Sequence, residues 1–230
     1  MNEDIKDLLA NLGAKPSISE ENGLDLLRDS DLTVFSPGIS SGGFAEIRMA
    51  TSNGNRKIVA TTIDTEGMDS AIKNIKELKL DTQIEAKIED LTKDFPYQEN
   101  YFDYIYARLV LHYFSYQELD AIFIKMRKSL KPSGHIFIVV RSEKNIDTNK
   151  PDQEYDPITR LTTVLYRDDN KNVIGKGVRY FHSPETIREH LERAGFEIDY
   201  IKECQEQLYK DFMRTKIAPR LDHVIEVHAK

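Results

Sequence analysis

The sequence has little of several features that mark specialised classes of protein. Its 230 residues include one cysteine, Cys204, so an intrachain disulfide and a Cys-x-x-Cys metal pair are both excluded. Apolar runs such as 136–140 are far shorter than the roughly 18 to 20 residues of a membrane-spanning helix. The start, Met1 to Asp4, is acidic where a secretion signal would be basic. We therefore expect a cytoplasmic protein without a membrane partner.

Basic residues are outnumbered as well. The chain has 32 Lys and Arg against 39 Asp and Glu, a formal net charge of -7. Proteins that hold the phosphate backbone of nucleic acid usually carry an excess of basic residues, so we expect no nucleic-acid partner. With 40% hydrophobic and 31% charged residues, the composition is that of a globular protein.

Strand-like and helix-like segments alternate along the chain, which is typical of α/β proteins. The predicted helices are 4–12, 20–28, 44–50, 68–78, 116–130 and 184–194. The predicted strands are 32–35, 57–63, 82–88, 102–107, 135–141, 197–203 and 223–229. Together they predict a doubly wound, mainly parallel seven-stranded sheet with helices on both faces.

Two regions fall outside this alternation. The two helices within residues 1–30 predict an N-terminal helical cap, and residues 31–230 would form the α/β domain. Residues 142–157 are polar and predict a long loop. Two apolar runs, 162–167 and 173–180, flank a turn-forming Asp-Asp-Asn-Lys-Asn segment and predict a hairpin. Residues 142–182 are therefore expected to form a lid inserted in the domain.

The turn at residues 36–43 lies between a predicted strand and helix, where open α/β sheets bind ligands. Gly38, Ser40 and Gly43 fit an altered G-x-G-x-x-G dinucleotide loop, whereas Gly38, Ser40 and Gly42 fit an altered G-x-G-x-G loop. A P-loop is excluded because no lysine follows Gly43. The turn alone leaves both kinds of loop open.

Motifs further along the chain favour one family. Asp64 ends the second strand, where a carboxylate can bind both hydroxyls of an adenosine ribose, a position that also suits NAD. Further motifs are Glu89-Asp90-Leu91, Phe102-Asp-Tyr-Ile-Tyr-Ala107, Leu109-Val-Leu-His-Tyr-Phe114 and Leu130-Lys-Pro-Ser-Gly-His-Ile-Phe-Ile138. With them, the chain resembles the Rossmann-like (class I) S-adenosylmethionine-dependent methyltransferases of the small-molecule type.

The resemblance implies S-adenosylmethionine as cofactor. Gly38 and Gly42 would line its methionine part, Asp64 would hold its ribose, and Asp90 with Leu91 would contact its adenine. The full set of expected cofactor-binding residues is Ser36, Gly38, Ser40, Gly42, Asp64, Asp90, Leu91, Ala107 and Arg108.

Two of these positions depart from the family pattern. Ser36 stands where the family usually has an acidic residue, and Ser40 where it has a second glycine. The first change would weaken neutralisation of the methionine ammonium, and the second would place a Cβ against the cofactor.

Methyl transfer needs in-line positioning, and a general base only where the nucleophile must lose a proton. His112 follows the fourth strand and is the candidate base because its pKa lies near neutrality. The expected substrate-pocket residues are Tyr106, Tyr113, Tyr116 and Arg141. The six histidines show no metal-binding spacing, so no metal is expected.

Three functions are consistent with these observations. We hypothesise methyl transfer to a small-molecule acceptor that the lid selects. A catalytically inactive binding or regulatory subunit of the same fold is the alternative that Ser36 and Ser40 support. An NAD-dependent oxidoreductase fits Asp64 and Gly43 but not the later motifs. A protein partner or a homo-oligomer stays open.

Overall fold

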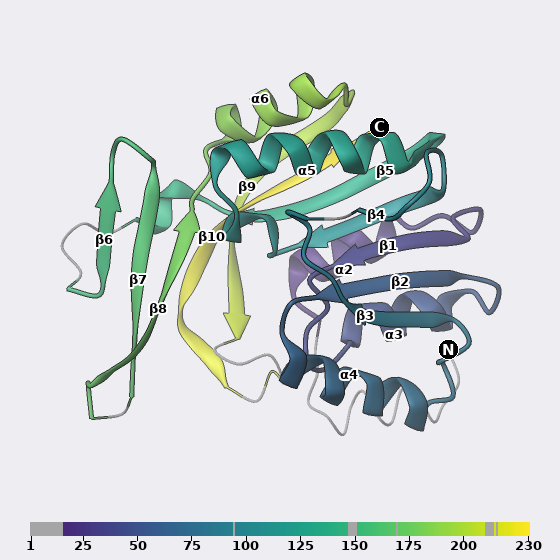
Figure 1. Ribbon diagram of the computed structural model, residues 1–230, viewed down its shortest axis with the longest axis horizontal. Helices are drawn as coiled ribbons and strands as arrows, with labels where there is room; N and C mark the ends of the chain where they lie inside the picture. Colours follow the sequence, from purple (N-terminus) through teal and green to yellow (C-terminus); the bar gives the residue numbers. More distant parts are fainter. Residues whose placement is uncertain (1–15, 94, 147–150, 169, 210–213, 215) are drawn as a thin grey trace.

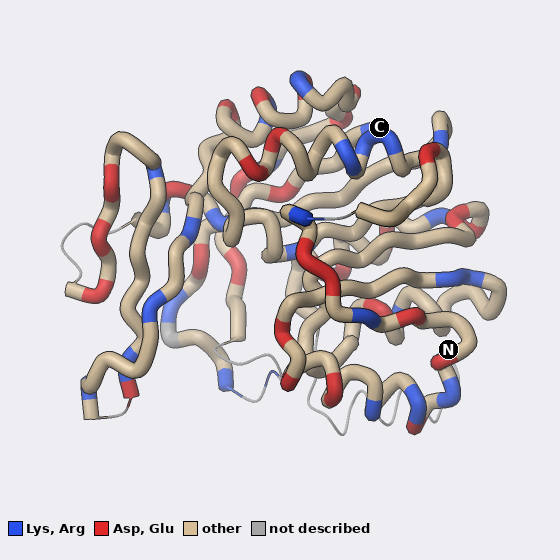
Figure 2. Tube along the Cα trace, viewed as in Figure 1, with Lys and Arg blue, Asp and Glu red and all other residues tan. Residues whose placement is uncertain are grey.

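The computed structural model describes residues 16–230 except 94, 147–150, 169, 210–213 and 215. The predicted helix 4–12 lies outside the described residues. No described helix is long and apolar enough to cross a membrane. Acidic and basic residues are interspersed along most of the trace (Figure 2).

A seven-stranded sheet forms the centre of the molecule (Figure 1). Its strands in spatial order are β3 (Ile84–Ile88), β2 (Lys57–Thr62), β1 (Thr33–Pro37), β4 (Phe102–Arg108), β5 (Leu130–Arg141), β10 (Ile217–Ala229) and β9 (Ile198–Tyr209). The first five strands in this order pair in parallel, and β10 is antiparallel to both of its neighbours, β5 and β9. The order steps outward from β1 in both directions, which confirms the predicted doubly wound, mainly parallel seven-stranded sheet.

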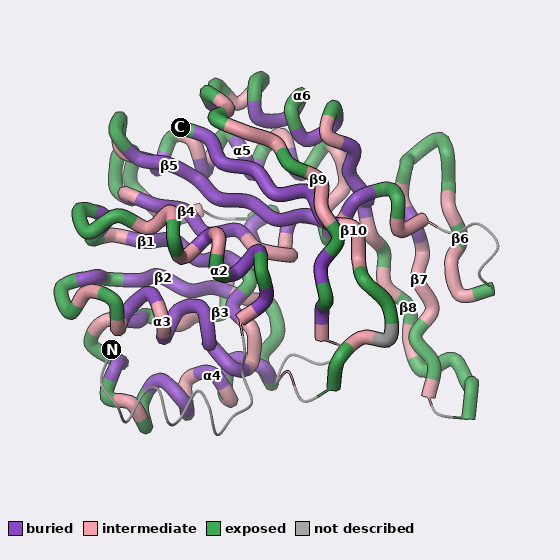
Figure 3. Tube along the Cα trace, turned by 180° about the vertical axis from the view of Figure 1, so that it is seen from behind, coloured by how far each residue is buried: buried purple, intermediate pink, exposed green. Residues whose placement is uncertain are grey.

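Alternating side chains of the strands point to opposite faces, and each face has its own core. Phe35 of β1 packs with α5 (Tyr116–Ser129) and α6 (Pro184–Ala194). Its neighbour Val34 packs with α3 (Phe44–Ser52) and α4 (Thr65–Glu77). The strands are accordingly buried through the middle of the molecule (Figure 3).

The N-terminal helix α2 (Ile18–Asp25) packs closely on the second face. A Cβ on Gly23 would lie 2.5 Å from the Phe137 ring and 2.6 Å from the Tyr106 ring, so only glycine allows this approach. The Tyr104 hydroxyl donates to the Gly23 carbonyl at 2.7 Å. Gly23 lies in the second half of α2 and Tyr104 lies within β4, so this contact fixes the helix against the strand.

The lid is a separate three-stranded sheet, with strands β6 (Gln153–Asp156), β7 (Leu161–Arg167) and β8 (Val173–Tyr180) in that order. The predicted hairpin is confirmed as β7 and β8. The predicted long loop 142–157 is wrong in part, because it contains β6 and the short 3-10 helix Glu143–Asn145. Strand β6 carries the polar sequence Gln-Glu-Tyr-Asp and is defined by its pairing with β7, which sequence patterning does not show.

Candidate functional site

Two adjoining cavities lie at the carboxyl ends of the parallel strands. The first, here the β2 cavity, has a volume of about 370 Å³ and is lined by residues that follow β1, β2, β3 and β4. The second, the β4 cavity, has a volume of about 170 Å³ and also receives residues from α2, α3, β5 and β9. Gly38, Ser40, Leu109 and Tyr113 line both cavities. The cavities therefore meet at the turn after β1.

Glycine is required at this meeting point. Gly38 has φ +84°, and a Cβ there would lie 2.7 Å from the Val110 Cβ. Its N–H donates to the Thr61 carbonyl at 2.6 Å, which ties the turn to β2. Gly43 (φ +62°) then begins α3 in the left-handed conformation. The altered glycine motif therefore still forms a close-fitting turn.

Carboxylates line the β2 cavity. Asp64 caps α4 by accepting the Gly67 N–H at 3.0 Å. Asp90 accepts hydrogen bonds from the Thr92 hydroxyl at 2.7 Å and from its N–H at 3.0 Å, and these bonds lower the Asp90 pKa. Leu91, 5% exposed, is among the apolar lining residues. The cavity thus combines hydrogen-bond acceptors with an apolar surface.

Glu89 belongs to the Glu89-Asp90-Leu91 motif but not to the expected site residues, and it lines the same cavity. One carboxyl oxygen accepts the Tyr97 hydroxyl at 2.7 Å, whereas the other, Oε1, is buried without a partner among the residues that the structure describes. Burial is the main cause that raises the Glu89 pKa. A buried unpartnered oxygen at a cavity is a site at which a ligand can donate a hydrogen bond.

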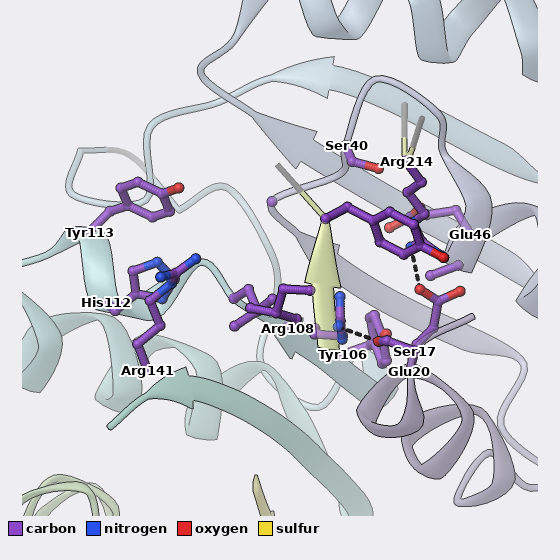
Figure 4. A pocket seen from close by; sticks show the side chains of 15 residues that line it. Ser17, Glu20, Ser40, Glu46, Tyr106, Arg108, His112, Tyr113, Arg141 and Arg214 are labelled. Atoms are coloured by element: carbon purple, nitrogen blue, oxygen red, sulfur yellow. Dashed lines mark hydrogen bonds and ion pairs between the residues drawn. The ribbon is translucent and has the colours of Figure 1, made fainter. Parts of the chain in front are cut away.

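The β4 cavity has charged groups of both signs (Figure 4). Glu20 is fully buried and pairs with Arg48 and Arg214. Arg108 hydrogen-bonds to Ser17, donates to the Ser19 hydroxyl at 2.8 Å and lies 3.3 Å from a Glu206 oxygen. These pairs join α2 to Arg48 of α3, to Arg214 and to the end of β4, and Arg108 also joins β4 to Glu206 of β9.

Glu46 of α3 lies beside Ser36, the position at which the family usually has an acidic residue. The Ser36 hydroxyl donates to the Glu46 carboxylate at 2.6 Å, and Glu46 lines the β4 cavity while Ser36 lines neither cavity. Burial raises the Glu46 pKa, and the Ser36 hydrogen bond opposes that shift. A carboxyl group is therefore present near the end of β1, supplied from the helix instead of the strand.

His112 and Tyr106 bring unpartnered polar atoms to the β4 cavity. His112 is 2% exposed and its Nδ1 has no hydrogen-bond partner in the described part of the chain. Tyr106 is 3% exposed and its hydroxyl is likewise unpartnered. Burial, followed by the charges of Arg141 and Arg179, holds the His112 pKa well below its ordinary value. The imidazole is therefore neutral at physiological pH.

Ten of the fourteen predicted site residues line these cavities; Ser36, Gly42, Ala107 and Tyr116 do not. Gly42 accepts a hydrogen bond from the Asn74 amide at 3.1 Å, and a Cβ on Gly42 would clash with the Phe44 ring. Ala107 is buried in the core on the α5 face. Tyr116 lines a third cavity toward the lid, where its hydroxyl lies 2.7 Å from Arg193.

Several lining residues were not predicted from the sequence. They include Ser17, Glu20, Glu46, Leu208, Tyr209 and Arg214 in the β4 cavity, and Glu89, Val110 and Phe114 in the β2 cavity. Glu89 adjoins Asp90 in sequence and could have been found by that signal. Glu20 and Arg214 come together from opposite ends of the chain and carry no local pattern.

No group of three or more His, Cys, Asp or Glu side chains that could hold a metal ion occurs among the residues that the structure describes.

Residues 37–138 match the model of the methyltransferase domain family. This segment is therefore similar in sequence to methyltransferase domains. It contains the turn after β1, Asp64, Asp90 and His112, and thus much of both cavities. The family implies S-adenosylmethionine as the cofactor. No curated protein sequence matches the chain.

Solved structures share the methyltransferase fold. A methyltransferase from Methanosarcina mazei has a TM-score of 0.71 at 16% identity, covering 89% of this chain and 94% of its own. The CcbJ methyltransferase from Streptomyces caelestis has a TM-score of 0.68 at 12% identity, covering 98% and 94%. The [4+2]-cyclase SpnF has a TM-score of 0.60 at 17% identity, covering 92% and 78%. Since one of these proteins is a cyclase, the fold by itself does not fix the reaction.

The residues present fit S-adenosylmethionine. The β2 cavity offers carboxylates and apolar contacts for an adenosine group, including the unpartnered Glu89 oxygen. The β4 cavity adjoins it through Gly38 and Ser40 and offers Glu46 and Arg214 for the charged ends of a methionine group. The two cavities together provide complementary groups along the length of the cofactor.

Proposed function

We propose that this protein transfers the methyl group of S-adenosylmethionine to a small-molecule acceptor. The observation that carries the proposal is that the two cavities meet at Gly38, Ser40, Leu109 and Tyr113. Carboxylates that can accept hydrogen bonds from a ribose line one cavity, and His112 lines the other. When bound, S-adenosylmethionine supplies an electrophilic methyl group on sulfur. The chain then has to orient the acceptor and exclude water.

In this proposal Asp64 accepts hydrogen bonds from the ribose, and Asp90 with Leu91 contacts adenine. Gly38 and Ser40 lie against the methionine part, and Glu46 takes the place of the carboxylate that Ser36 lacks. Asp64 is exposed at the cavity, and its bond to Gly67 leaves acceptor capacity for further bonds.

His112 is the proposed catalytic residue. Its neutral imidazole has a buried, unpartnered Nδ1 at the β4 cavity, so it can accept a hydrogen bond from the acceptor and take its proton. Tyr106, Tyr113 and Arg141 line the same cavity and would contact the acceptor.

The inactive-subunit alternative rested on Ser36 and Ser40. The Glu46 carboxyl group beside Ser36 offsets the first change, and Ser40 lines both cavities without closing either. The family match favours methyl transfer over an NAD-dependent oxidoreductase.

The test is a transfer assay with methyl-labelled S-adenosylmethionine and a panel of small phenols, carboxylic acids, amines and thiols. Release of S-adenosylhomocysteine with label in one acceptor class would support the proposal. Tight cofactor binding without label transfer to any acceptor would favour the inactive subunit, and binding of NADH alone would favour the oxidoreductase.

A further inference from the structure

The His112 end of the β4 cavity lies in a field of positive charge. Arg141, at the carboxyl end of β5, lines the cavity beside His112 (Figure 4). Arg179 comes from β8 of the lid, and its guanidinium lies 4.0 Å from the centroid of the Tyr113 ring. Tyr113 lines both cavities and stacks on His112 with a centroid distance of 4.5 Å. Arg141 therefore lines the β4 cavity from the body of the molecule, whereas Arg179 lines neither cavity and lies against the Tyr113 ring from the lid.

Arg179 keeps its charge uncompensated. Its guanidinium hydrogen-bonds to the Val178 carbonyl at 2.9 Å and to the Tyr166 hydroxyl, both neutral groups. No carboxylate pairs with Arg179 among the residues that the structure describes. Figure 2 shows basic residues on β8 and acidic ones on β6, on the other side of the lid.

Arg141 is only partly compensated. One of its nitrogens lies 3.1 Å from a carboxylate oxygen of Asp222, and its side chain is 32% exposed. A guanidinium has five N–H donors, so this single contact leaves donors that can face a ligand.

The third group is the neutral imidazole of His112. Burial is the main cause that disfavours a proton on the ring, and Arg141, Arg179 and His182 act in the same direction. The same field disfavours a cationic ligand beside the ring and favours an anionic one. The unpartnered Nδ1, buried at 2% exposure, shows in addition that this end of the cavity has an unused hydrogen-bonding position.

We propose that the acceptor is a small organic carboxylate that also carries a hydroxyl group. Its carboxylate binds Arg141 and Arg179, and its hydroxyl hydrogen-bonds to His112. Guanidinium groups suit this ligand because their planar N–H pairs match the two oxygens of a carboxylate. Arg179 is then a specificity-determining residue that the lid contributes. The assignment of the hydroxy acid as methyl acceptor rests on the proposed function, whereas its binding does not.

The experiment measures binding of three probes of nearly equal size by calorimetry: 4-hydroxybenzoate, 4-hydroxybenzamide and 4-hydroxybenzylamine. Each is titrated into the full chain with and without S-adenosylhomocysteine. We expect the anion to bind about tenfold more tightly than the neutral amide, with the cation weakest. Equal affinities for the anion and the amide, or no binding of the anion at millimolar concentration, would overturn the proposal without any variant.

Variants then test the residues. Arg179→Met and Arg141→Met should each remove most of the preference for the anion. Lys176→Met is the matched control, since Lys176 is an exposed residue of β8, an odd number of positions from Arg179 and so on the opposite face of the strand. A preference that survives both arginine variants, or that Lys176→Met abolishes equally, would contradict the assignment. If the wild type prefers the anion but does not bind S-adenosylhomocysteine, the proposed function is contradicted while the proposed anion site stands.

Discussion

Single buried atoms mark the site at the residue scale. Glu89 Oε1, Tyr106 Oη and His112 Nδ1 are buried without a hydrogen-bond partner in the described part of the chain, and all three residues line the cavities. Leaving such an atom unpaired costs about 1 to 3 kcal/mol of folding free energy. A ligand that pairs these atoms recovers part of that cost as binding free energy.

His112→Phe tests the proposed base. The phenyl ring can keep the stack on Tyr113 while removing the nitrogen, so transfer should fall about 100-fold or more. Removing an unpaired buried polar atom should also raise the free energy of unfolding, by about 1 kcal/mol. The control is the affinity for S-adenosylhomocysteine, which should differ between wild type and variant by no more than about threefold. Unchanged transfer would show that His112 is a packing residue.

Glu46→Gln tests the replacement of the missing acid. The amide keeps the size of the side chain and can still accept the Ser36 hydrogen bond, but it carries no charge for an ammonium group. We expect affinity for S-adenosylhomocysteine to fall about tenfold in calorimetry. Glu66→Gln, an exposed position in the first turn of α4, is the matched control. Equal affinities of wild type and Glu46→Gln would remove Glu46 from the cofactor site.

At the scale of elements, the site depends on turns and strand ends. The turn after β1 brings Gly38 against Val110, and the paired ends of β9 and β10 extend far enough to place Leu208 and Tyr209 at the β4 cavity. Segments between regular elements therefore supply most of the β2 cavity lining, whereas helices and strands supply most of the β4 cavity lining.

Gly38→Ala should disrupt the turn. The backbone has φ +84° and the new methyl group would lie 2.7 Å from Val110, so we expect a loss of about 1 to 3 kcal/mol in unfolding free energy together with loss of cofactor binding. Gly54→Ala is the matched control, because its Cβ would meet nothing within 4 Å. Chemical denaturation of both variants gives the comparison, and equal stability of the two would contradict the role of Gly38.

The strands of the sheet could be predicted because each carries its own apolar pattern, as in Ile136–Val140. The ends of β9 could not, because Glu206 occupies an inward position where the pattern calls for an apolar residue. Glu206 is 2% exposed and accepts hydrogen bonds from Ser19, a partner distant in sequence. Asp64 and His112 could be found from the sequence because they follow strands with a local apolar pattern. Glu20 and Arg214 could not, because they are distant in sequence and only the fold brings them together.

At the scale of the whole molecule, the cavities lie at the carboxyl ends of the parallel strands, and β8 of the lid contacts Tyr113 beside them. Ser142, which begins the lid, pairs with His182, which follows β8, so the two ends of the lid meet beside β5. Buried histidines lie under this junction. His182 is fully buried, and neither of its ring nitrogens has a partner among the described residues.

Burial lowers the pKa of His182 to about 3. The unfolded chain binds a proton at this histidine near pH 6.5 while the folded chain does not, so its contribution to stability is lost as pH falls from 6.5 toward 3. The loss is about 1.4 kcal/mol per pH unit for one histidine. The raised pKa values of Glu46 and Glu89 act in the opposite sense, so the effect of His182 is read against a variant.

The measurement is chemical denaturation of wild type and His182→Phe at neutral and mildly acidic pH. The wild type should lose more unfolding free energy than the variant as the pH falls below 6.5. Parallel pH dependence of the two proteins would show that His182 gains its proton in the folded state.

The central claim is that Asp64 and the cavities beside it bind S-adenosylmethionine. Calorimetric titration of S-adenosylhomocysteine and NADH into wild type, Asp64→Asn and Asp64→Ser tests it most directly. Both variants keep a side chain that can cap α4, so the helix start remains intact while the carboxylate is lost. We expect wild type to bind S-adenosylhomocysteine and not NADH. Each variant should bind S-adenosylhomocysteine at least about tenfold more weakly than wild type. Undiminished binding in both variants, or no binding by wild type, would contradict the claim.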